Sequence, residues 1–323
     1  MKAIRIFTKI HSFVFVSICF SFSCEKENND CIDPEIHNED VGTWTRQSDF
    51  PVYLNDITFL LSTENYIYAG RFGTMDPNYR AVYFDQQNET WNYIDTFPNF
   101  YLLGINTFAI DDKLYAGGGE TWGSYSTQYY VFDPILNSWS PIADCPVGIS
   151  KATGFSVGGK GYLIGGKNNY QNNMEVYKYD PNSDTWSING SVGIYSGEWV
   201  NDFEVVGNSV FTYLNNSILE YNVASNTQSE ITINKKESEA LHEFIYSDSV
   251  AIYISGYSIP NSTQCHWEYE VIYRFDVLSR SWAIHKKYER QYRNGGHYNE
   301  SFLMDDDLHF VIGANKQHWI FEP

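Results

Sequence analysis

Aromatic and amide side chains are concentrated in several loops of this chain. The loops follow short β-rich runs that end in glycine or another small residue, and they include "GETWGSYSTQ", "KNNYQNNME" and "YSIPNSTQCHWEY". Aromatic rings stack on the C–H faces of sugar rings, and amide groups donate to and accept from hydroxyls. We therefore expect these loops to bind a carbohydrate, with Trp122 and Trp267 as the aromatic platforms. The alternative is that the tyrosine-rich loops only pack on one another.

A second group of polar residues lies just before a set of repeated phenylalanines. If the repeats described below form a ring, these residues would lie near the mouth of its central channel and make a polar ring with acidic character. The candidate ligand-binding residues of the ring are Asn201, His242, Glu243 and Glu300, and its other members are Asn106, Asp202 and Asn299. The alternative is a hydrated channel that holds no ligand.

One basic stretch stands out in an acidic chain. The run "HKKYERQYR", from His285 to Arg293, contains two lysines and two arginines of the 21 basic side chains in the protein. Arg290 and Arg293 are therefore candidate partners for an anionic ligand such as an acidic sugar. The alternative is that they only neutralise nearby glutamates.

Motifs of known catalytic sites are missing from the sequence. It contains no GxSxG, P-loop or EF-hand loop, and "HEFIY" lacks the second histidine of HExxH. Five cysteines without a CxxC pair predict neither a disulfide framework nor a zinc site. We expect no metal or other cofactor, and a binding role is favoured over an enzymatic one.

The elements that must hold these loops recur along the chain. Four stretches combine a short β-run ending in aspartate, a turn and a tryptophan six residues after the aspartate: "AVYFDQQNETW", "YVFDPILNSW", "YKYDPNSDTW" and "YRFDVLSRSW". Two degraded copies are "LEYNVASNTQ" and the final "WIFEP". The acidic position returns at a spacing of about 47 residues, at Asp85, Asp133, Asp180, Asn222, Asp276 and Glu322.

A phenylalanine keeps the same spacing upstream of each aspartate. These residues are Phe59, Phe108, Phe155, Phe203, Phe244 and Phe302. Between the two landmarks lies a β-rich run that mostly ends in small residues, as in "KLYAGGG" and "GYLIGG". Each unit therefore predicts four antiparallel strands, the content of one propeller blade. We expect the phenylalanines and tryptophans to pack between blades, and the aspartates to bond the backbone two residues on.

The double glycine, the aspartate and the following tryptophan together resemble the kelch repeat. The resemblance covers residues 41–323 and implies an all-β, six-bladed kelch β-propeller with four antiparallel strands per blade. The pairing of Arg290 and Arg293 with Glu300 is similar in type to the arginine-and-carboxylate site of periplasmic kelch mutarotases that act on sialic acid. A sugar mutarotase or epimerase is therefore the alternative function from the enzyme class.

The two ends of the repeat region predict how the ring closes. The last unit stops at "WIFEP", its third strand, whereas "GTWTRQSDFP" near the N-terminus has the pattern of a fourth strand without the first three. We expect the segment around Trp44 to pair beside "WIFEP" and to complete the sixth blade, which hides exposed sheet edges.

The N-terminal residues have the pattern of an export signal. Basic residues precede an apolar run of about a dozen residues, too short for a membrane span. Residues 1–23 resemble a lipoprotein signal peptide, with Cys24 as the lipidated residue; secretion after simple cleavage is the alternative. Residues 24–40 predict an acidic tether, and its "CEKEN" start resembles surface-export tethers of Bacteroidetes lipoproteins.

The composition agrees with an exported domain. The net charge of −19 argues against nucleic acid or an anionic membrane surface as a partner. We expect attachment to the membrane through the lipid alone, in the cell envelope at the outer membrane or cell surface. The predicted function is that of a lipid-anchored propeller that binds a glycan or an envelope protein through its loop-rich face; a protein-interaction scaffold in an envelope complex is a further alternative.

Overall fold

The structure is a computed structural model that describes residues 43–46, 58–72, 81–99, 101–192, 203–214, 217–233, 239–247, 250–258, 269–289, 298–304, 307–312 and 317–322. Every regular element in these residues is a β-strand. Contacts group Ile36–Pro323 into one unit, and the description below concerns that unit. The architecture is all-β, as the repeats predict.

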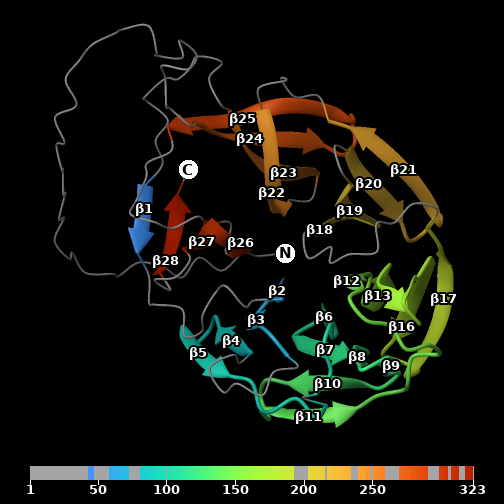
Figure 1. Ribbon diagram of the computed structural model, residues 1–323. Coiled ribbons are helices and arrows are strands. Elements are labelled where there is room, and N and C mark those ends of the chain that lie inside the picture. Colours follow the sequence, from blue (N-terminus) through green and yellow to red (C-terminus); the bar gives the residue numbers. More distant parts are fainter. Residues whose placement is uncertain are drawn as a thin grey trace, which may run out of the picture. The chain divides into compact units, whose positions relative to one another are not determined.

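Five four-stranded antiparallel sheets are each built from strands of one continuous stretch of chain, and we number them blades 1 to 5 (Figure 1). Blade 1 comprises β2 (Phe59–Ser62), β3 (Tyr66–Gly70), β4 (Val82–Asp85) and β5 (Thr90–Tyr93). Blade 2 comprises β6 (Asn106–Ile110), β7 (Lys113–Gly117), β10 (Tyr129–Asp133) and β11 (Ser138–Pro141). Blade 3 comprises β12 (Thr153–Val157), β13 (Lys160–Ile164), β16 (Glu175–Asp180) and β17 (Thr185–Ser191). Blade 4 comprises β18 (Phe203–Val206), β19 (Ser209–Leu214), β20 (Ser217–Asn222) and β21 (Thr227–Thr232). Blade 5 comprises β22 (Glu239–Ser247), β23 (Ala251–Ser258), β24 (Tyr269–Asp276) and β25 (Ser281–Glu289).

A further four-stranded sheet, the closing sheet, contains strands from both ends of the unit. Its strands are β26 (Tyr298–Met304), β27 (Asp307–Ile312), β28 (Gln317–Glu322) and β1 (Thr43–Arg46). β1 pairs antiparallel with β28, so that Thr43 lies opposite Glu322 and Arg46 opposite Trp319. The sequence predicts six blades; five are continuous in the chain, and the role of the closing sheet as a sixth is argued under the proposed function.

The first strands of neighbouring sheets contact one another. The contacting series is β2, β6, β12, β18, β22 and β26, and β26 in turn contacts β2; these strands can be followed around the centre of Figure 1. Sheets that meet through their first strands around a centre make a propeller. The loops of successive blades are thereby brought side by side.

Aromatic side chains fill the space between blades. Trp186 of blade 3 packs against Tyr129 and Phe108 of blade 2, with ring centroids 4.8 and 6.1 Å apart. Trp139 of blade 2 packs against Phe72, which follows blade 1, at 5.5 Å. The indole nitrogens of Trp139 and Trp186 donate to the backbone oxygens of Asp95 and Ala143, each 2.9 Å away. For these two tryptophans the predicted packing between blades is confirmed.

The repeated aspartates organise the turn between the third and fourth strands of a blade. The carboxylate of Asp133 accepts from the backbone N–H groups of Ile135 and Leu136, and that of Asp180 from the N–H of Asn182 at 2.9 Å. In the degraded copy, the Asn222 side chain accepts the same type of bond from Ala224. The expectation that these positions serve the turn is confirmed. Lys113 and Lys160 also pair with Asp133 and Asp180 and, as the largest cause in each case, hold the pKa of these carboxyls below the usual range.

Candidate ligand-binding site

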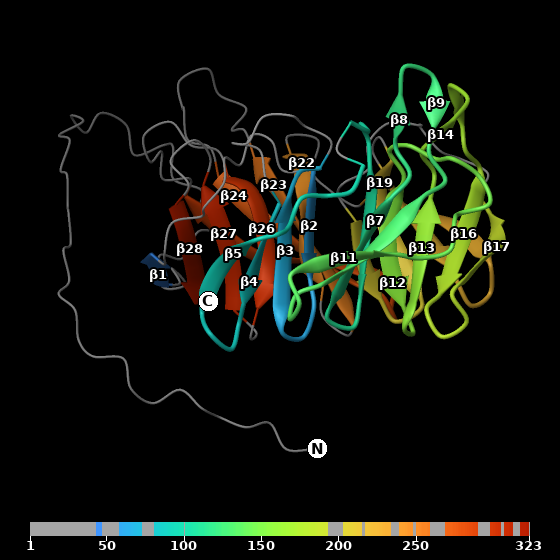
Figure 2. The same ribbon diagram turned by 90° about the horizontal axis from the view of Figure 1, so that it is seen from below.

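Two short hairpins project from the loop face over blades 2 and 3. The first is made of β8 (Glu120–Thr121) and β9 (Ser124–Tyr125), and the second of β14 (Lys167–Asn168) and β15 (Gln171–Asn172). Figure 2 shows β8, β9 and β14 standing beyond the strands of the blades. Each hairpin follows the double glycine of its blade, so the hairpins are the loops "GETWGSYSTQ" and "KNNYQNNME" in which the sequence predicts a ligand site.

The glycines before each hairpin are required by close backbone approach. Gly118 and Gly166 have φ angles of +66° and +77°. A Cβ atom on Gly118 would lie 2.4 Å from the backbone oxygen of Ile149, and one on Gly166 would lie 2.6 Å from that of Ser150. A larger residue at either position would therefore push its hairpin away from the loop that enters blade 3.

Backbone hydrogen bonds connect each hairpin to the loop that enters its own blade. Leu103 and Glu120 exchange two bonds of 2.9 and 2.8 Å, and Ser150 and Lys167 exchange two bonds of 3.0 and 2.8 Å. In addition, the N–H of Gly119 donates to Ile149 across the two blades at 2.8 Å. Loops from two blades are thus held in one connected layer, which fixes the relative positions of their backbones.

The two hairpins also contact each other directly. The rings of Tyr125 and Tyr170 meet edge to face at 6.0 Å, and the backbone N–H of Tyr170 donates to the Tyr125 hydroxyl at 3.1 Å. Gly123 lies under the Tyr170 hydroxyl, where a Cβ atom would come within 2.6 Å. The expectation that tyrosine-rich loops pack on one another is correct for this pair, although the packing leaves other aromatic side chains exposed.

Large aromatic side chains on this layer face solvent. Trp122 at the tip of the first hairpin is fully exposed, and Tyr170 at the tip of the second is 73% exposed. Tyr101 and Leu103, in the loop that enters blade 2, are 64% and 51% exposed. Trp122 therefore lies exposed on the layer that the two hairpins form.

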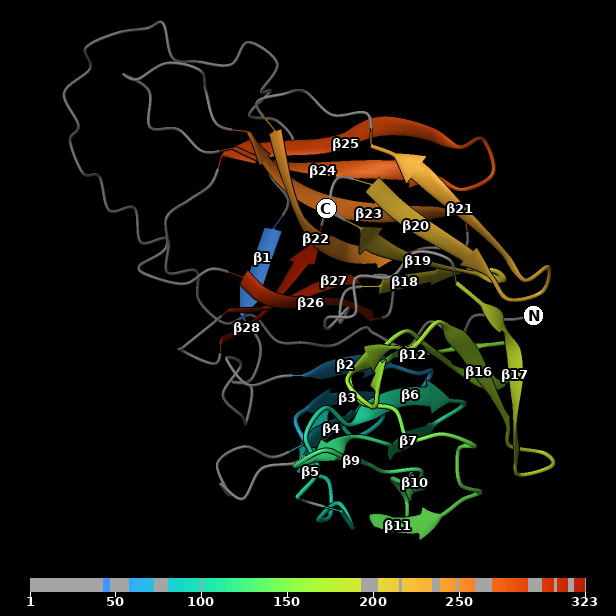
Figure 3. The ribbon, with the colours of Figure 1, turned by 45° about the vertical axis from the view of Figure 1, so that its right-hand side comes forward.

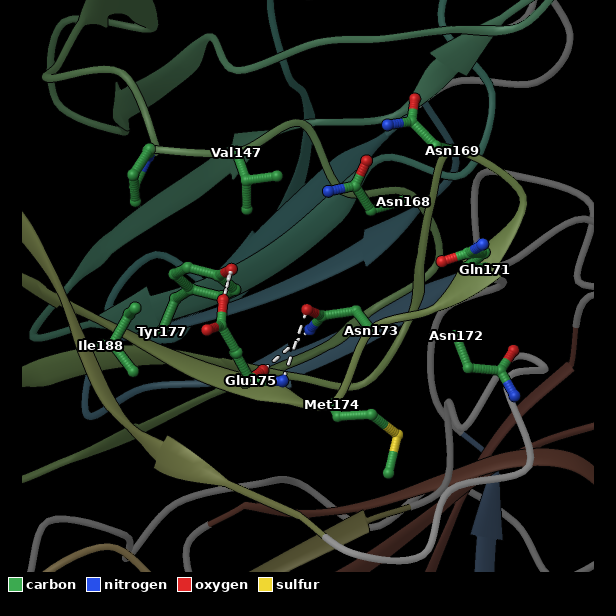
Figure 4. Close-up of a pocket in the computed structure, with 11 residues that line it drawn as sticks. Val147, Asn168, Asn169, Gln171, Asn172, Asn173, Met174, Glu175, Tyr177 and Ile188 are labelled. Atoms are coloured by element: carbon green, nitrogen blue, oxygen red, sulfur yellow. Dashed lines mark hydrogen bonds between the residues drawn. The ribbon is translucent and has the colours of Figure 1, made fainter.

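A pocket of about 400 Å³ lies beside the second hairpin (Figure 4). Its amide lining comes from Asn168, Asn169, Gln171, Asn172 and Asn173, and its remaining lining from Pro146, Val147, Met174, Glu175, Tyr177 and Ile188. Residues 146–147 belong to the loop between blades 2 and 3, whereas the others belong to blade 3 and its hairpin. The pocket thus combines a polar wall with a small apolar rim.

The amides of the pocket differ in their hydrogen bonding. Asn173 is buried and donates to the backbone oxygens of Gly165 and Glu175 at 2.9 and 2.7 Å, so its role is to hold the base of the hairpin. The side chains of Asn168, Asn169, Gln171 and Asn172 form no hydrogen bond with another described residue. Four carboxamides are therefore available to hydrogen-bond a ligand.

Glu175 and Tyr177 form a pair in the pocket wall. The Tyr177 hydroxyl donates to a carboxylate oxygen of Glu175, as the dashed line in Figure 4 shows. Burial and then the bond to Glu175 hold the pKa of Tyr177 far above its usual value. The phenol therefore keeps its proton and remains a donor.

The candidate residues predicted from the sequence are only partly brought together. Trp122 lies on the hairpin layer described above. His242 and Glu243 lie on β22 and Glu300 on β26, two first strands that contact each other. The ladder between β22 and β23 is irregular between Leu241 and Glu243, and Glu243 pairs with Ser255. Trp267, Arg290, Arg293, Asn201 and Cys24 lie outside the described residues.

Asn106, expected in the polar ring of the channel, has a structural role instead. It is 1% exposed, and its amide nitrogen donates to the Tyr129 hydroxyl at 2.8 Å and to the backbone oxygen of Ile149 at 2.9 Å. Its amide oxygen accepts from the N–H of Ala152 at 2.7 Å. Each polar atom of the side chain is satisfied by the protein, so Asn106 links blade 2 to the loop that enters blade 3 rather than facing a ligand.

Two further features were sought in the part of the chain that the structure describes: a cluster of metal ligands and a membrane-spanning helix. No group of histidine, cysteine, aspartate and glutamate side chains is placed there to hold a metal ion. A search of the same residues finds no long apolar helix of the kind that crosses a membrane.

Comparison with known proteins supports the repeat assignment. No family model matches the chain. Kelch-like protein 30 of Homo sapiens is 26% identical over 110 residues, which cover 32% of this chain and 18% of that protein. Kelch-like protein 15 of Mus musculus is 27% identical over 177 residues, which cover 47% of this chain and 29% of that protein. The chain therefore spans less than a third of the length of these curated relatives.

A solved structure supports the same fold. The chain titled "Structure of YjhT" superposes with a TM-score of 0.56 at 14% identity, covering 85% of this chain and 95% of that one. The findings together support a kelch-repeat β-propeller. A fold of this kind serves as a protein-binding or enzyme-like module, and the choice between these roles depends on the site.

Proposed function

We propose that this kelch-type propeller is a binding module that takes a carbohydrate through the pocket and the two hairpins over blades 2 and 3. The observation that carries the proposal is the set of four carboxamides that bond to no other described residue, beside exposed aromatic rings. Amides offer both donors and acceptors to hydroxyls, and aromatic faces accept the C–H face of a sugar ring. The pocket volume of about 400 Å³ is in the range of small-molecule sites.

The layer that carries the pocket suits binding because it is already ordered. Four backbone hydrogen bonds attach the hairpins to the loops that enter blades 2 and 3, and Tyr125 holds Tyr170. A surface that is preorganised loses little conformational entropy when a ligand binds. The ligand would therefore meet the backbone of both hairpins in one arrangement.

An envelope protein is the second candidate ligand. Trp122, Tyr170, Tyr101 and Leu103 expose aromatic and aliphatic surface on one layer of connected loops. Aromatic side chains are enriched among the residues that dominate protein interfaces. The sugar mutarotase alternative depends on Arg290 and Arg293, which lie outside the described residues, and on Glu300, of which the strand position alone is described.

The proposal includes a six-bladed ring and a lipid anchor. We infer that the closing sheet is the sixth blade, because β1 supplies its fourth strand and β26 contacts both β22 and β2. The signal-like residues 1–23, Cys24 and the acidic residues 24–40 suggest export and attachment through lipid at the outer membrane or cell surface. Loss of labelled fatty acid from a Cys24→Ala variant is the expected result for the anchor.

The proposed function is tested by a glycan-binding screen on the purified full-length chain. For any glycan that binds, Trp122→Ala and Asn172→Ala should each weaken binding about tenfold. This corresponds to about 1.4 kcal/mol, more than the roughly 1 kcal/mol that most contact residues cost when truncated. Tyr93→Ala, at an exposed tyrosine of blade 1, is the matched control and should leave binding unchanged.

The binding of the two variants distinguishes a carbohydrate ligand from an envelope-protein ligand. A glycan whose affinity is the same for the parent chain and for both site variants would place the carbohydrate site elsewhere. Binding of an envelope protein that is lost in Trp122→Ala and retained in Asn172→Ala would favour the protein-binding candidate, since Trp122 lies on the exposed layer and Asn172 lines the pocket.

A further inference from the structure

The lining of the pocket carries a negative charge, which limits the class of sugar that the pocket can bind. Among its lining residues, Glu175 is the single side chain with a formal charge at neutral pH, and lysine, arginine and histidine are missing from the described lining. The whole chain carries a net charge of −19. An anionic group in this pocket would therefore meet a negative charge without a compensating cation.

The Glu175 carboxylate is only partly satisfied by the protein. One oxygen accepts from Tyr177, whose high pKa keeps the phenol protonated. The other oxygen forms no hydrogen bond or ion pair with a described residue. An ionised carboxylate has acceptor sites on both oxygens, so the pocket keeps an acceptor for a ligand donor.

The free acceptor oxygen of Glu175 lies across the pocket from the amides. Figure 4 shows Glu175 and Tyr177 on one side of the pocket and Asn168, Asn169, Gln171 and Asn172 on the other. An ammonium group brings three donors and a positive charge and so complements a carboxylate. Hydroxyl groups on the same ligand would face the amide wall.

We propose, as an extension of the carbohydrate-binding function on which this inference rests, that the pocket takes a sugar with a free, protonated amine seated against Glu175. The hydroxyls of the sugar are bound by the four carboxamides that have no partner among the described residues. Tyr177 orients the carboxylate through its hydroxyl and does not contact the ammonium. Acidic sugars are disfavoured at this pocket.

The test compares three probes by calorimetry on the purified full-length chain: short β-1,4-glucosamine oligomers with free amines, the same oligomers after N-acetylation, and oligogalacturonate. The free amine should bind about tenfold more tightly than its N-acetylated form, because charge-assisted hydrogen bonds are roughly twice as strong as neutral ones. Oligogalacturonate should bind most weakly. The preference should disappear as the pH rises through the pKa of the amine.

Two variants make the test specific. Glu175→Gln removes the charge and keeps an oxygen that Tyr177 can donate to, so it should abolish the tenfold preference while binding of the N-acetylated oligomer changes less than about twofold. Glu64→Gln removes one charge from an exposed position of blade 1 and serves as the control, with no change expected. Unchanged melting curves verify that the variants are folded.

The failures of the two proposals can be told apart. If the N-acetylated oligomer binds as tightly as the free amine, and Asn172→Ala weakens both equally, the amine inference is wrong and carbohydrate binding at the pocket stands. If Glu175→Gln leaves a preference for the amine intact, the inference is also wrong. If neither Asn172→Ala nor Glu175→Gln changes the binding of any sugar, both proposals fall.

Discussion

At the scale of single residues, burial decides which amides are free to act. Asn106 and Asn172 have the same side chain, and the sequence predicts both to lie in candidate binding regions, Asn106 in the polar ring and Asn172 in the loop "KNNYQNNME". Asn106 is buried and forms three hydrogen bonds with the protein, whereas Asn172 is exposed in the pocket wall and forms none with the described residues. Residue type therefore predicts the kind of chemistry, and the surrounding backbone decides whether a ligand can reach it.

Glu204 is a carboxyl group whose protonation should affect stability. It lies on β18, and the Ser247 hydroxyl of β22 donates to it at 2.6 Å. Burial raises the pKa of Glu204 to about 7 from an ordinary value of 4.5. Between these two pH values the folded chain binds more protons than the unfolded chain, so the free energy of unfolding falls as the pH rises through this window.

We predict that Glu204→Gln removes this part of the pH dependence. The free energy of unfolding of the parent chain should fall by about 3 kcal/mol more than that of the variant between pH 4.5 and pH 8. Urea denaturation at a series of pH values measures the difference, and Glu64→Gln at an exposed position is the control. Parallel curves for the parent and Glu204→Gln would show that Glu204 ionises as freely in the folded chain as in the unfolded one.

At the scale of elements, the turn before each fourth strand contains a left-handed residue that is not glycine. The equivalent positions are Glu89, Asn137, Asp184, Asn226 and Arg280, with φ angles between +48° and +54°. Asn137 and Asp184 use this geometry, because their side chains accept backbone N–H bonds from Asp95 and Ala143 of the preceding inter-blade segment. Among the described residues, no backbone N–H donates to the Glu89 side chain, so no described contact offsets the backbone strain at this turn.

We predict that Glu89→Gly stabilises the fold. Left-handed backbone costs a non-glycine residue about 1–2 kcal/mol, and part of this gain is offset by the entropy that glycine loses on folding. The net increase in the free energy of unfolding should be about 0.5–1 kcal/mol, measured by urea denaturation. Glu89→Ala, which keeps the strain and removes the same carboxylate, is the control; equal stabilities for the two variants would contradict the prediction.

The strands and turns of the blades could be predicted because their signals are local. Alternating residues, an aspartate that bonds its own turn and a tryptophan that follows it recur in each unit, so Phe132 could be paired with Trp139 from one stretch of sequence. The pocket could not be predicted in the same way. Its walls come from Val147 in one loop and from Glu175 and Tyr177 in a strand, and their meeting depends on contacts between elements. The abundance of amides in "KNNYQNNME" is the signal that pointed to the region.

At the scale of the whole molecule, the described contacts join the beginning and the end of the propeller unit. β1 forms the outermost strand of the closing sheet and covers the edge of β28, while β26 contacts β2 of blade 1. An uncovered strand edge exposes backbone donors and acceptors. In addition, the pairing of β1 with β28 restrains two segments that are far apart in the sequence.

We predict that deleting residues 43–46 lowers the melting temperature by at least about 5 °C, because the four register pairs between β1 and β28 are lost and β28 becomes an edge. Deletion of residues 37–40 shortens the chain equally without removing a strand position of the closing sheet, and it should leave the melting temperature unchanged. Calorimetry on the two variants and the parent chain measures the effect. Equal melting temperatures would mean that β1 adds nothing to the stability of the closing sheet.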